Sequence, residues 1–296
     1  MTRNQALSQA QELLAANDFE DASLESELLL RHTLKISRVQ LYLDLNCELS
    51  PKQEKTFRHL IKRRLSGEPT AYITGHREFY GLDFYVDSRV LIPRPESELL
   101  VEKALDLARY QTIATIAEIG TGCGAIAISL ALNLPEVKIY ATDISTPALE
   151  VARINCQQHE VADRICLLSG DMLDPLPEIA DLIVANLPYV KEAELPETGP
   201  VSFEPKLALN GGPEGMARIS RLCQQVSSKL RPRGCLFIEI GQGQGEAATT
   251  LLRNLFPSMV AEVTPDLSGI ERVVSLCLTQ KRLDAKLAMV LPETKE

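Results

Sequence analysis

The sequence predicts an α/β fold in which helices flank a seven-stranded sheet, together with a separate helical domain at the N-terminus. Three observations support this prediction. After Thr115, short apolar runs alternate with amphipathic segments, which is typical of a parallel sheet covered by helices. Before Gly67 the chain has no glycine, and its apolar residues recur at helical spacing. A length of 296 residues is sufficient for two domains with their own cores.

Residues 1–75 are expected to form a helical domain that recognises a substrate, because they contain no polar constellation suited to catalysis. Ser50 and Pro51 predict a helix start, since serine caps a helix N-terminus and proline suits the first helical position. Four helices are expected, near residues 6–15, 24–30, 34–45 and 51–65.

Residues 76–88 are expected to form a β-hairpin connector, because two runs rich in aromatic residues flank Gly81. The α/β domain is expected over residues 89–280, beginning with a helix that ends near residue 107. Residues 281–296 are expected to be a loosely held C-terminal tail. The seven strands are expected near residues 116–119, 137–142, 165–168, 182–185, 235–240, 260–263 and 272–278.

The composition is that of an ordinary globular protein, with 45% hydrophobic and 24% charged residues. No apolar run reaches the ~18 residues of a membrane span, and the N-terminus lacks the apolar core of a signal peptide. We therefore expect a cytoplasmic protein without membrane association. The seven cysteines are scattered and the four histidines are isolated, so we expect reduced thiols and no metal site.

The net charge of −9 disfavours a protein that grips a nucleic-acid backbone, so no stable nucleic-acid partner is expected. Residues 1–75 contain ten basic and ten acidic residues, and the acidic excess therefore lies after them. One basic cluster could contact RNA or an acidic partner, although a solvated helix face is favoured. The cluster consists of Lys52, Lys55, Arg58, Lys62, Arg63 and Arg64.

A loop that begins at Asn186 follows an apolar run expected to be a buried strand. Ligands of open α/β sheets bind beyond the carboxyl ends of the strands. There, the Asn186 amide oxygen and the Leu187 carbonyl could accept hydrogen bonds from an NH2 group. Pro188 would shape the loop, and the Tyr189 ring could stack on a planar group. The alternative is a turn that merely ends the strand, since asparagine and proline both do so.

A glycine-rich turn follows the first expected strand of the sheet. Its sequence, G-x-G-x-G, differs from the G-x-G-x-x-G of folds that cradle a pyrophosphate. Glu118, two residues before the first glycine, would repel a pyrophosphate but attract an ammonium group. A ligand with an amino-acid end and a nucleoside end, such as S-adenosylmethionine, fits these features. The turn consists of Gly120, Thr121, Gly122, Cys123 and Gly124.

Two further carboxylates follow the next two expected strands. Asp143 could accept hydrogen bonds from both hydroxyl groups of a ribose, a role known from dinucleotide folds. Asp171 could accept one from an adenine amino group, and Met172 could pack on the adenine ring. A loop carboxylate is ordinary by itself. Together with Glu118, however, the carboxylates form a set that favours a nucleoside site.

Further motifs extend over nearly the whole chain. They include Gly67-Glu68-Pro69, Glu78-Phe79-Tyr80-Gly81, Leu91-Ile92-Pro93-Arg94-Pro95-Glu96, Phe203-Glu204-Pro205, Gly211-Gly212-Pro213-Glu214-Gly215, Glu239-Ile240-Gly241 and Asp266-Leu267-Ser268-Gly269-Ile270-Glu271-Arg272. With the glycine turn and the Asn186 loop, they make the chain resemble the class I S-adenosylmethionine-dependent methyltransferases. Within these it resembles the HemK/PrmC family, the peptide chain release factor glutamine N5-methyltransferases.

The resemblance implies a Rossmann-like sheet, S-adenosylmethionine as methyl donor, and a release factor as protein substrate. The methyl acceptor would be the side-chain nitrogen of the glutamine in the Gly-Gly-Gln loop of the release factor. Asn186 would border both cofactor and substrate. Arg94, between two prolines, could bind an anion or pair with a surface carboxylate, and it is a candidate for gripping the substrate with the helical domain. A monomer is expected.

The chain departs from the family pattern at Leu187, where the family motif N-P-P-Y has proline. In the family this position acts through its backbone carbonyl, which leucine also supplies, so activity should be retained with some loss of rigidity. Ser97 stands where threonine is usual, and Arg233 stands where glycine is common. Three other functions stay open: methylation of a ribosomal-protein glutamine, methylation of an exocyclic base amine, and a non-catalytic adaptor that binds S-adenosylmethionine.

Overall fold

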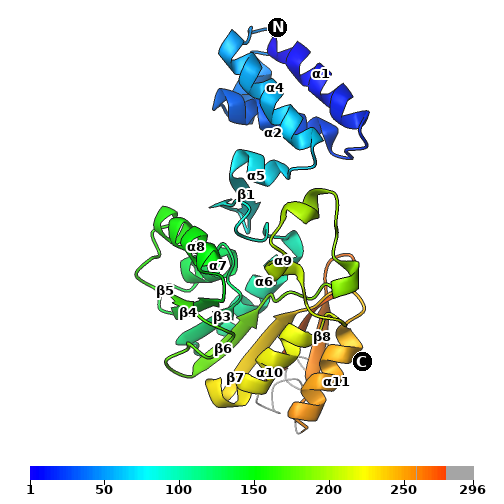
Figure 1. The fold of residues 1–296 in the computed structure, drawn as a ribbon. Helices are drawn as coiled ribbons and strands as arrows, with labels where there is room; N and C mark the ends of the chain where they lie inside the picture. Colours follow the sequence, from blue (N-terminus) through cyan, green and yellow to red (C-terminus); the bar gives the residue numbers. More distant parts are fainter. Residues whose placement is uncertain (258, 278–296) are drawn as a thin grey trace, which may run out of the picture. The chain divides into compact units, whose positions relative to one another are not determined.

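A computed structural model describes residues 1–257 and 259–277 (Figure 1). The expected tail and the last residue of the seventh expected strand lie outside these residues. The chain divides into two compact units. The helical unit comprises Met1–His76, Val86–Ser88 and Pro196–Glu204. The sheet unit comprises Arg77–Tyr85, Arg89–Leu195 and the described residues from Pro205 onward.

The helical unit contains the four expected helices and a fifth short one. Ser50 caps the N-terminus of α4 as predicted: its hydroxyl accepts from the Gln53 N–H, and the Gln53 side chain accepts from the Ser50 N–H. Leucines and alanines of the helices form a core of their own, to which Leu14, Leu29 and Leu41 contribute. The helices are α1 (Arg3–Ala15), α2 (Ala22–Leu34), α3 (Arg38–Leu43), α4 (Pro51–Leu65) and α5 (Thr70–Thr74), and a 3-10 turn, η3 (Pro200–Phe203), belongs to the same unit.

The basic cluster lies on α4, and its three arginines form ion pairs. Arg58 pairs with Glu54, Arg63 with Glu68, and the buried Arg64 with Glu25. The three lysines of the cluster, Lys52, Lys55 and Lys62, are exposed.

The sheet unit contains all seven expected strands in the order β5-β4-β3-β6-β7-β9-β8 (Figure 1). They are β3 (Thr115–Ile119), β4 (Lys138–Asp143), β5 (Ile165–Ser169), β6 (Ala180–Ala185), β7 (Leu230–Glu239), β8 (Ala261–Pro265) and β9 (Glu271–Cys277). The helices are α6 (Glu98–Ala108), α7 (Ala125–Asn133), α8 (Thr146–Gln158), α9 (Lys206–Leu209), α10 (Ala217–Lys229) and α11 (Gly245–Leu255). The hairpin β1 (His76–Phe79) and β2 (Leu82–Tyr85), and the 3-10 turns η1 (Pro95–Ser97) and η2 (Glu192–Glu194), complete the elements.

Strand β9 runs antiparallel to both of its neighbours, whereas the alternating pattern predicted a parallel sheet. The reason is the short turn after β8, since a parallel connection requires a crossover of a dozen or more residues. Asp266 shapes this turn: one carboxylate oxygen accepts from the N–H groups of Ser268 and Ile270, and the other accepts from Arg272. The Rossmann-like order of the other strands is unaffected.

The centre of the sheet is buried on both faces. Every residue of β3 is buried, as are Leu182 to Ala185 in β6. Helices α10 and α11 pack against each other, α10 on β7 and α11 on β8 and β9 (Figure 1). This burial explains why the strands read as continuous apolar runs rather than as alternating ones.

Two cysteines contradict the expectation of reduced thiols. Cys235 of β7 and Cys277 of β9 lie opposite each other in the antiparallel pair and are joined as a disulfide. Their distance of 42 positions in the sequence gives no hint of this pairing, which depends on the register of the two strands. Cys47, Cys123, Cys156, Cys166 and Cys223 are free thiols. Among the described residues, no helix combines the length and apolar character that crossing a membrane requires.

Candidate active site

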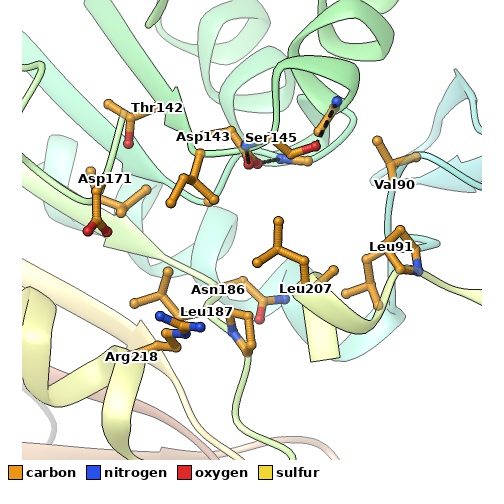
Figure 2. A pocket seen from close by; sticks show the side chains of 18 of the residues that line it. Val90, Leu91, Thr142, Asp143, Ser145, Asp171, Asn186, Leu187, Leu207 and Arg218 are labelled. Carbon is orange, nitrogen blue, oxygen red and sulfur yellow. Dashed lines mark hydrogen bonds between the residues drawn. The ribbon is translucent and has the colours of Figure 1, made fainter. Parts of the chain in front are cut away.

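A cavity of about 140 Å3 lies at the carboxyl ends of β3, β4, β5 and β6 (Figure 2). This edge of the sheet is where the sequence placed a ligand, because the loops after parallel strands meet there. Eight of the predicted site residues line it: Gly120, Gly122, Asp143, Asp171, Met172, Asn186, Leu187 and Pro188. Glu118, Thr121, Cys123, Gly124, Tyr189 and Arg94 do not. Sequence reasoning missed several other lining residues, among them Arg89, Val90, Leu91, Ser145, Leu207 and Arg218.

The glycine turn brings the backbone of β3 close to the Asn186 loop. Gly120 has a φ of +75°, and a Cβ there would lie 3.2 Å from Leu187 Cδ2 and 3.3 Å from the Asn186 carbonyl oxygen. At Gly122, with φ +56°, a Cβ would meet no protein atom within 4 Å. The first glycine therefore permits a close contact inside the protein, and the second leaves open space beside the cavity.

Glu118 lies beneath the glycine turn and is 1% exposed. Its Oε2 accepts hydrogen bonds from the Thr121 hydroxyl at 2.6 Å and from the Ala127 N–H at 3.1 Å. Burial raises the pKa of this carboxyl group to about 8, although the two hydrogen bonds lower it. The structure thus places Glu118 as a brace between the turn and helix α7, rather than on the cavity wall.

Asp143 ends β4 and faces the cavity (Figure 2). Its Oδ2 accepts from the Gly122 N–H at 2.9 Å, and its Oδ1 accepts from the Ser145 N–H at 2.8 Å. Burial raises its pKa, and the hydrogen bonds lower it. A carboxylate has about four acceptor positions, so roughly two remain for the hydroxyl groups of a ribose. Asp143 and the open space at Gly122 therefore fit the nucleoside part of S-adenosylmethionine.

Asp171 and Met172 follow β5 and line the same cavity. Arg221 of α10 forms an ion pair with Asp171, which the sequence did not indicate. Met172 is 8% exposed and adopts a left-handed backbone conformation with φ +50°. The Thr142 hydroxyl donates to the Met172 carbonyl at 3.0 Å and holds this unusual backbone in place.

The Asn186 loop leaves the end of β6 with its amide held in one orientation. The Asn186 Nδ2 donates to Ser97 Oγ at 2.8 Å, so the Oδ1 atom stays available as an acceptor. Asn186 lines the cavity with Leu187, whose side chain is only 4% exposed (Figure 2). The Tyr189 hydroxyl donates to Glu239 Oε1 at 3.3 Å. The loop therefore ends the strand, as the simpler interpretation required, and also presents polar groups at the cavity.

Glu239, at the end of β7, is a site residue to which sequence reasoning assigned no role. It is 1% exposed, and within the described residues its Oε2 has no hydrogen-bond partner at ordinary distance. Burial raises its pKa to about 7, while the interactions with Ser97 and Tyr189 lower it. The available signal was an acidic residue inside the apolar run of residues 235–240.

Tyr189 is also shielded from solvent, and this affects its hydroxyl group. Burial and the nearby Glu239 charge raise the pKa of the phenol, whereas the positive charges of Arg272 and Arg94 lower it. Arg94 thus lies near enough to Tyr189 to affect it, even though it does not line the cavity. The phenol stays neutral at physiological pH and can donate a hydrogen bond.

Comparison with known proteins gives a matching family model for each of the two parts of the chain. Residues 5–75 match the family model "PrmC N-terminal domain", and residues 95–198 match "Methyltransferase small domain". A crystal structure of a methyltransferase from Pyrococcus furiosus has a TM-score of 0.50 and 17% identity, covering 67% of this chain and 90% of that one. That likeness concerns the fold alone.

Two curated relatives cover nearly the whole chain, and both are named release factor glutamine methyltransferase. The protein of Koribacter versatilis is 39% identical over 93% of this chain and 98% of its own length. The protein of Moorella thermoacetica is 43% identical over 92% of this chain and 97% of its own length. With this identity over both units, and with the glycine turn and Asn186 loop meeting at one cavity, the chain belongs to the family of release factor glutamine methyltransferases.

Proposed function

We propose that the protein transfers a methyl group from S-adenosylmethionine to the side-chain amide nitrogen of a glutamine in a release factor, within its Gly-Gly-Gln loop. The observation that carries the proposal is the position of Asn186. Its amide oxygen is available at the wall of a cavity that also presents the Asp143 carboxylate. One group thus suits the NH2 of the methyl acceptor, and the other suits the ribose of the donor.

The cofactor-binding roles are assigned as follows. Asp143 accepts from the ribose hydroxyls, Met172 packs on the adenine ring, and the open space at Gly122 admits the ligand. Gly120 brings the turn against the Asn186 loop, and the brace of Glu118 and Thr121 keeps the turn rigid. The bound cofactor supplies an electrophilic methyl group on a sulfonium. Cys123 and Gly124 continue the turn, and Asp171 lies at the adenine end.

The methyl-accepting nitrogen of the glutamine becomes more reactive when its own N–H groups donate hydrogen bonds to the enzyme. A glutamine amide is a poor nucleophile because its nitrogen lone pair is delocalised into the carbonyl. Asn186 Oδ1 and the Leu187 carbonyl accept hydrogen bonds from its two N–H groups and favour a more pyramidal nitrogen as positive charge develops there. As the N–C bond forms, the methyl–sulfur bond breaks to leave a neutral thioether, and the nitrogen then loses one of its two protons to water. Pro188 shapes the loop, and Tyr189 stacks on the amide plane. Much of the rate gain comes from this positioning.

Other parts of the chain are assigned to binding of the protein substrate. The helical residues 1–75 recognise the release factor, and residues 89–280 catalyse the methyl transfer. The hairpin of residues 76–88 connects these two parts of the chain. Arg94, whose charge already reaches Tyr189, is proposed to contact the substrate near the glutamine. The protein acts in the cytoplasm as a monomer and without a stable nucleic-acid partner. The three arginines of the α4 cluster are held in ion pairs, which supports a protein substrate over a nucleic-acid backbone.

The test is mass spectrometry of a purified release factor after incubation with the enzyme and S-adenosylmethionine. The expected result is one added methyl group on the glutamine of the Gly-Gly-Gln loop. Asn186→Ala should abolish this transfer and leave most of the S-adenosylmethionine affinity, because Asp143 and the glycine turn are intact. Methylation of a ribosomal protein or of nucleic acid instead, with the release factor unmodified, would refute the proposal.

A further inference from the structure

Ser97 stands between the Asn186 loop and the buried carboxylate of β7. Its side chain belongs to η1, is 3% exposed and does not line the cavity. Its oxygen accepts the hydrogen bond from Asn186 Nδ2 at 2.8 Å. Its interaction with Glu239 is one of those that lower the pKa of that carboxyl group. Ser97 thus bonds an amide at the cavity and lies close enough to a solvent-excluded carboxylate to affect its pKa.

When Glu239 is ionised, the hydrogens of Asn186 and Ser97 permit one arrangement of hydrogen bonds among the three side chains. A carboxylate only accepts, and Glu239 Oε2 is buried without a hydrogen-bond partner among the described residues, so the single Ser97 proton is free to turn toward this carboxylate. Ser97 can then only accept from Asn186, which turns the amide nitrogen inward and leaves Oδ1 for the substrate. With Glu239 protonated, the order reverses: Glu239 donates to Ser97, Ser97 donates to Asn186 Oδ1, and the acceptor is lost.

We propose that Glu239 is a positioning residue that, through Ser97, holds the Asn186 amide with its oxygen toward the methyl-accepting nitrogen. The same carboxylate accepts from the Tyr189 hydroxyl and so anchors the other end of the loop. This inference rests on the proposed function, since it explains how the acceptor of that reaction is oriented. It assigns Glu239 no contact with substrate or cofactor.

The ionisation of Glu239 gives the inference a pH dependence. Burial opposes ionisation, and so does Glu96 of η1; Arg272 of β9, Tyr189 and Ser97 favour it. Because the resulting pKa is about 7, the oriented state is lost as the pH falls below neutrality. The turnover number kcat should therefore fall as the pH falls through 7, while S-adenosylmethionine binding changes little.

The experiment measures kcat, the KM for a release factor and the Kd for S-adenosylmethionine in four variants. Ser97→Ala removes the link, Ser97→Thr keeps the hydroxyl, and Glu239→Gln keeps the shape without the charge. Ser129→Ala is the matched control, because Ser129 is also buried but, among the described residues, its hydroxyl donates within its own helix, to the Ala125 carbonyl. Thermal melting confirms that each variant is folded.

Ser97→Ala and Glu239→Gln should lower kcat by about 10- to 100-fold, the effect of losing a hydrogen bond that involves a charged group. Their Kd for S-adenosylmethionine should stay within about threefold, well under the tenfold that 1.4 kcal/mol represents. Ser97→Thr and Ser129→Ala should keep kcat, and the acidic fall in kcat should vanish in Glu239→Gln. If the wild type is active and Ser97→Ala has the same kcat as Ser129→Ala, the inference is wrong and the proposed function stands. A wild type that leaves the glutamine unmethylated overturns the proposed function and the inference together.

Discussion

At the scale of single residues, Leu187 has two separable contributions. Its backbone carbonyl is the proposed acceptor for one substrate hydrogen, and any residue supplies that group. Its side chain is 4% exposed, belongs to the core of the sheet unit, and packs beside Gly120. The departure from the family proline therefore does more than free the backbone, because the leucine fills space between the loop and the glycine turn.

Substitution of Leu187 by alanine separates the two contributions. Leu187→Ala should lower the free energy of unfolding by about 2–4 kcal/mol, because it removes buried methyl groups and leaves a cavity. The turnover number of the folded enzyme should stay within about tenfold of the wild type, because the Leu187 carbonyl remains. A tenfold change corresponds to about 1.4 kcal/mol of activation free energy, which allows for a modest shift of the loop. Urea unfolding and initial-rate assays measure the two quantities. Loss of activity comparable to that of Asn186→Ala would show that the side chain, not the carbonyl, matters.

At the scale of elements, the glycine turn after β3 contacts the loop after β6, the neighbouring strand of the sheet. Strands β3 and β6 pair in parallel, so the loops that follow them leave the same edge side by side. Gly120 permits the contact between these loops, whereas Gly122 faces open space. The turn thus serves two purposes at neighbouring positions, and matched alanine substitutions can distinguish them.

Gly120→Ala should lower both stability and kcat, because its Cβ would press on Leu187 and on the Asn186 carbonyl in a backbone conformation that costs roughly 1–2 kcal/mol for alanine. Gly122→Ala carries the same backbone cost but no internal contact. It should instead weaken S-adenosylmethionine binding, since its methyl group stands beside the cavity. Calorimetric titration and thermal melting test this contrast. Equal losses of stability and of cofactor affinity in both variants would contradict it.

At the scale of the whole molecule, the buried Glu118 makes stability depend on pH. Its pKa is about 8 in the folded protein against an ordinary value of 4.5, so the folded state binds the proton more tightly than the unfolded chain. The contribution of Glu118 to stability is therefore fully present below pH 4.5 and is lost as the pH rises to 8. Among the described residues, the charge that acts on the ionised Glu118 is that of Asp143, which has the same sign and does not offset the burial.

Glu118→Gln should accordingly be more stable than the wild type at pH 8 and similar to it near pH 4.5. The difference can reach at most about 5 kcal/mol, since one pKa unit corresponds to about 1.4 kcal/mol. The glutamine oxygen can still accept from Thr121 and from the Ala127 N–H. Denaturant unfolding at a series of pH values measures the difference. A constant difference across this range would mean that Glu118 ionises freely in the folded protein.

The sequence by itself determined the element types and the chemistry of the site. Residues buried on both faces of the sheet must be apolar, so the central strands were visible as runs, and the cap at Ser50 was visible from local chemistry. Glycines and carboxylates at the ends of strands β3, β4 and β5 indicated a nucleoside site, because strand ends of one sheet meet at one edge. The family resemblance then supplied the methyl acceptor.

Only the tertiary structure decided which polar groups face the cavity and which face the interior. The sequence placed both Glu118 and Asp143 at the ligand, yet the first braces the turn and the second lines the cavity. The antiparallel direction of β9 and the pairing of Cys235 with Cys277 depend on strand register. The hydrogen bond from Asn186 to Ser97 and the one from Tyr189 to Glu239 join distant segments of the chain. Contacts of this kind arise from packing between elements, and no local pattern in the sequence records them.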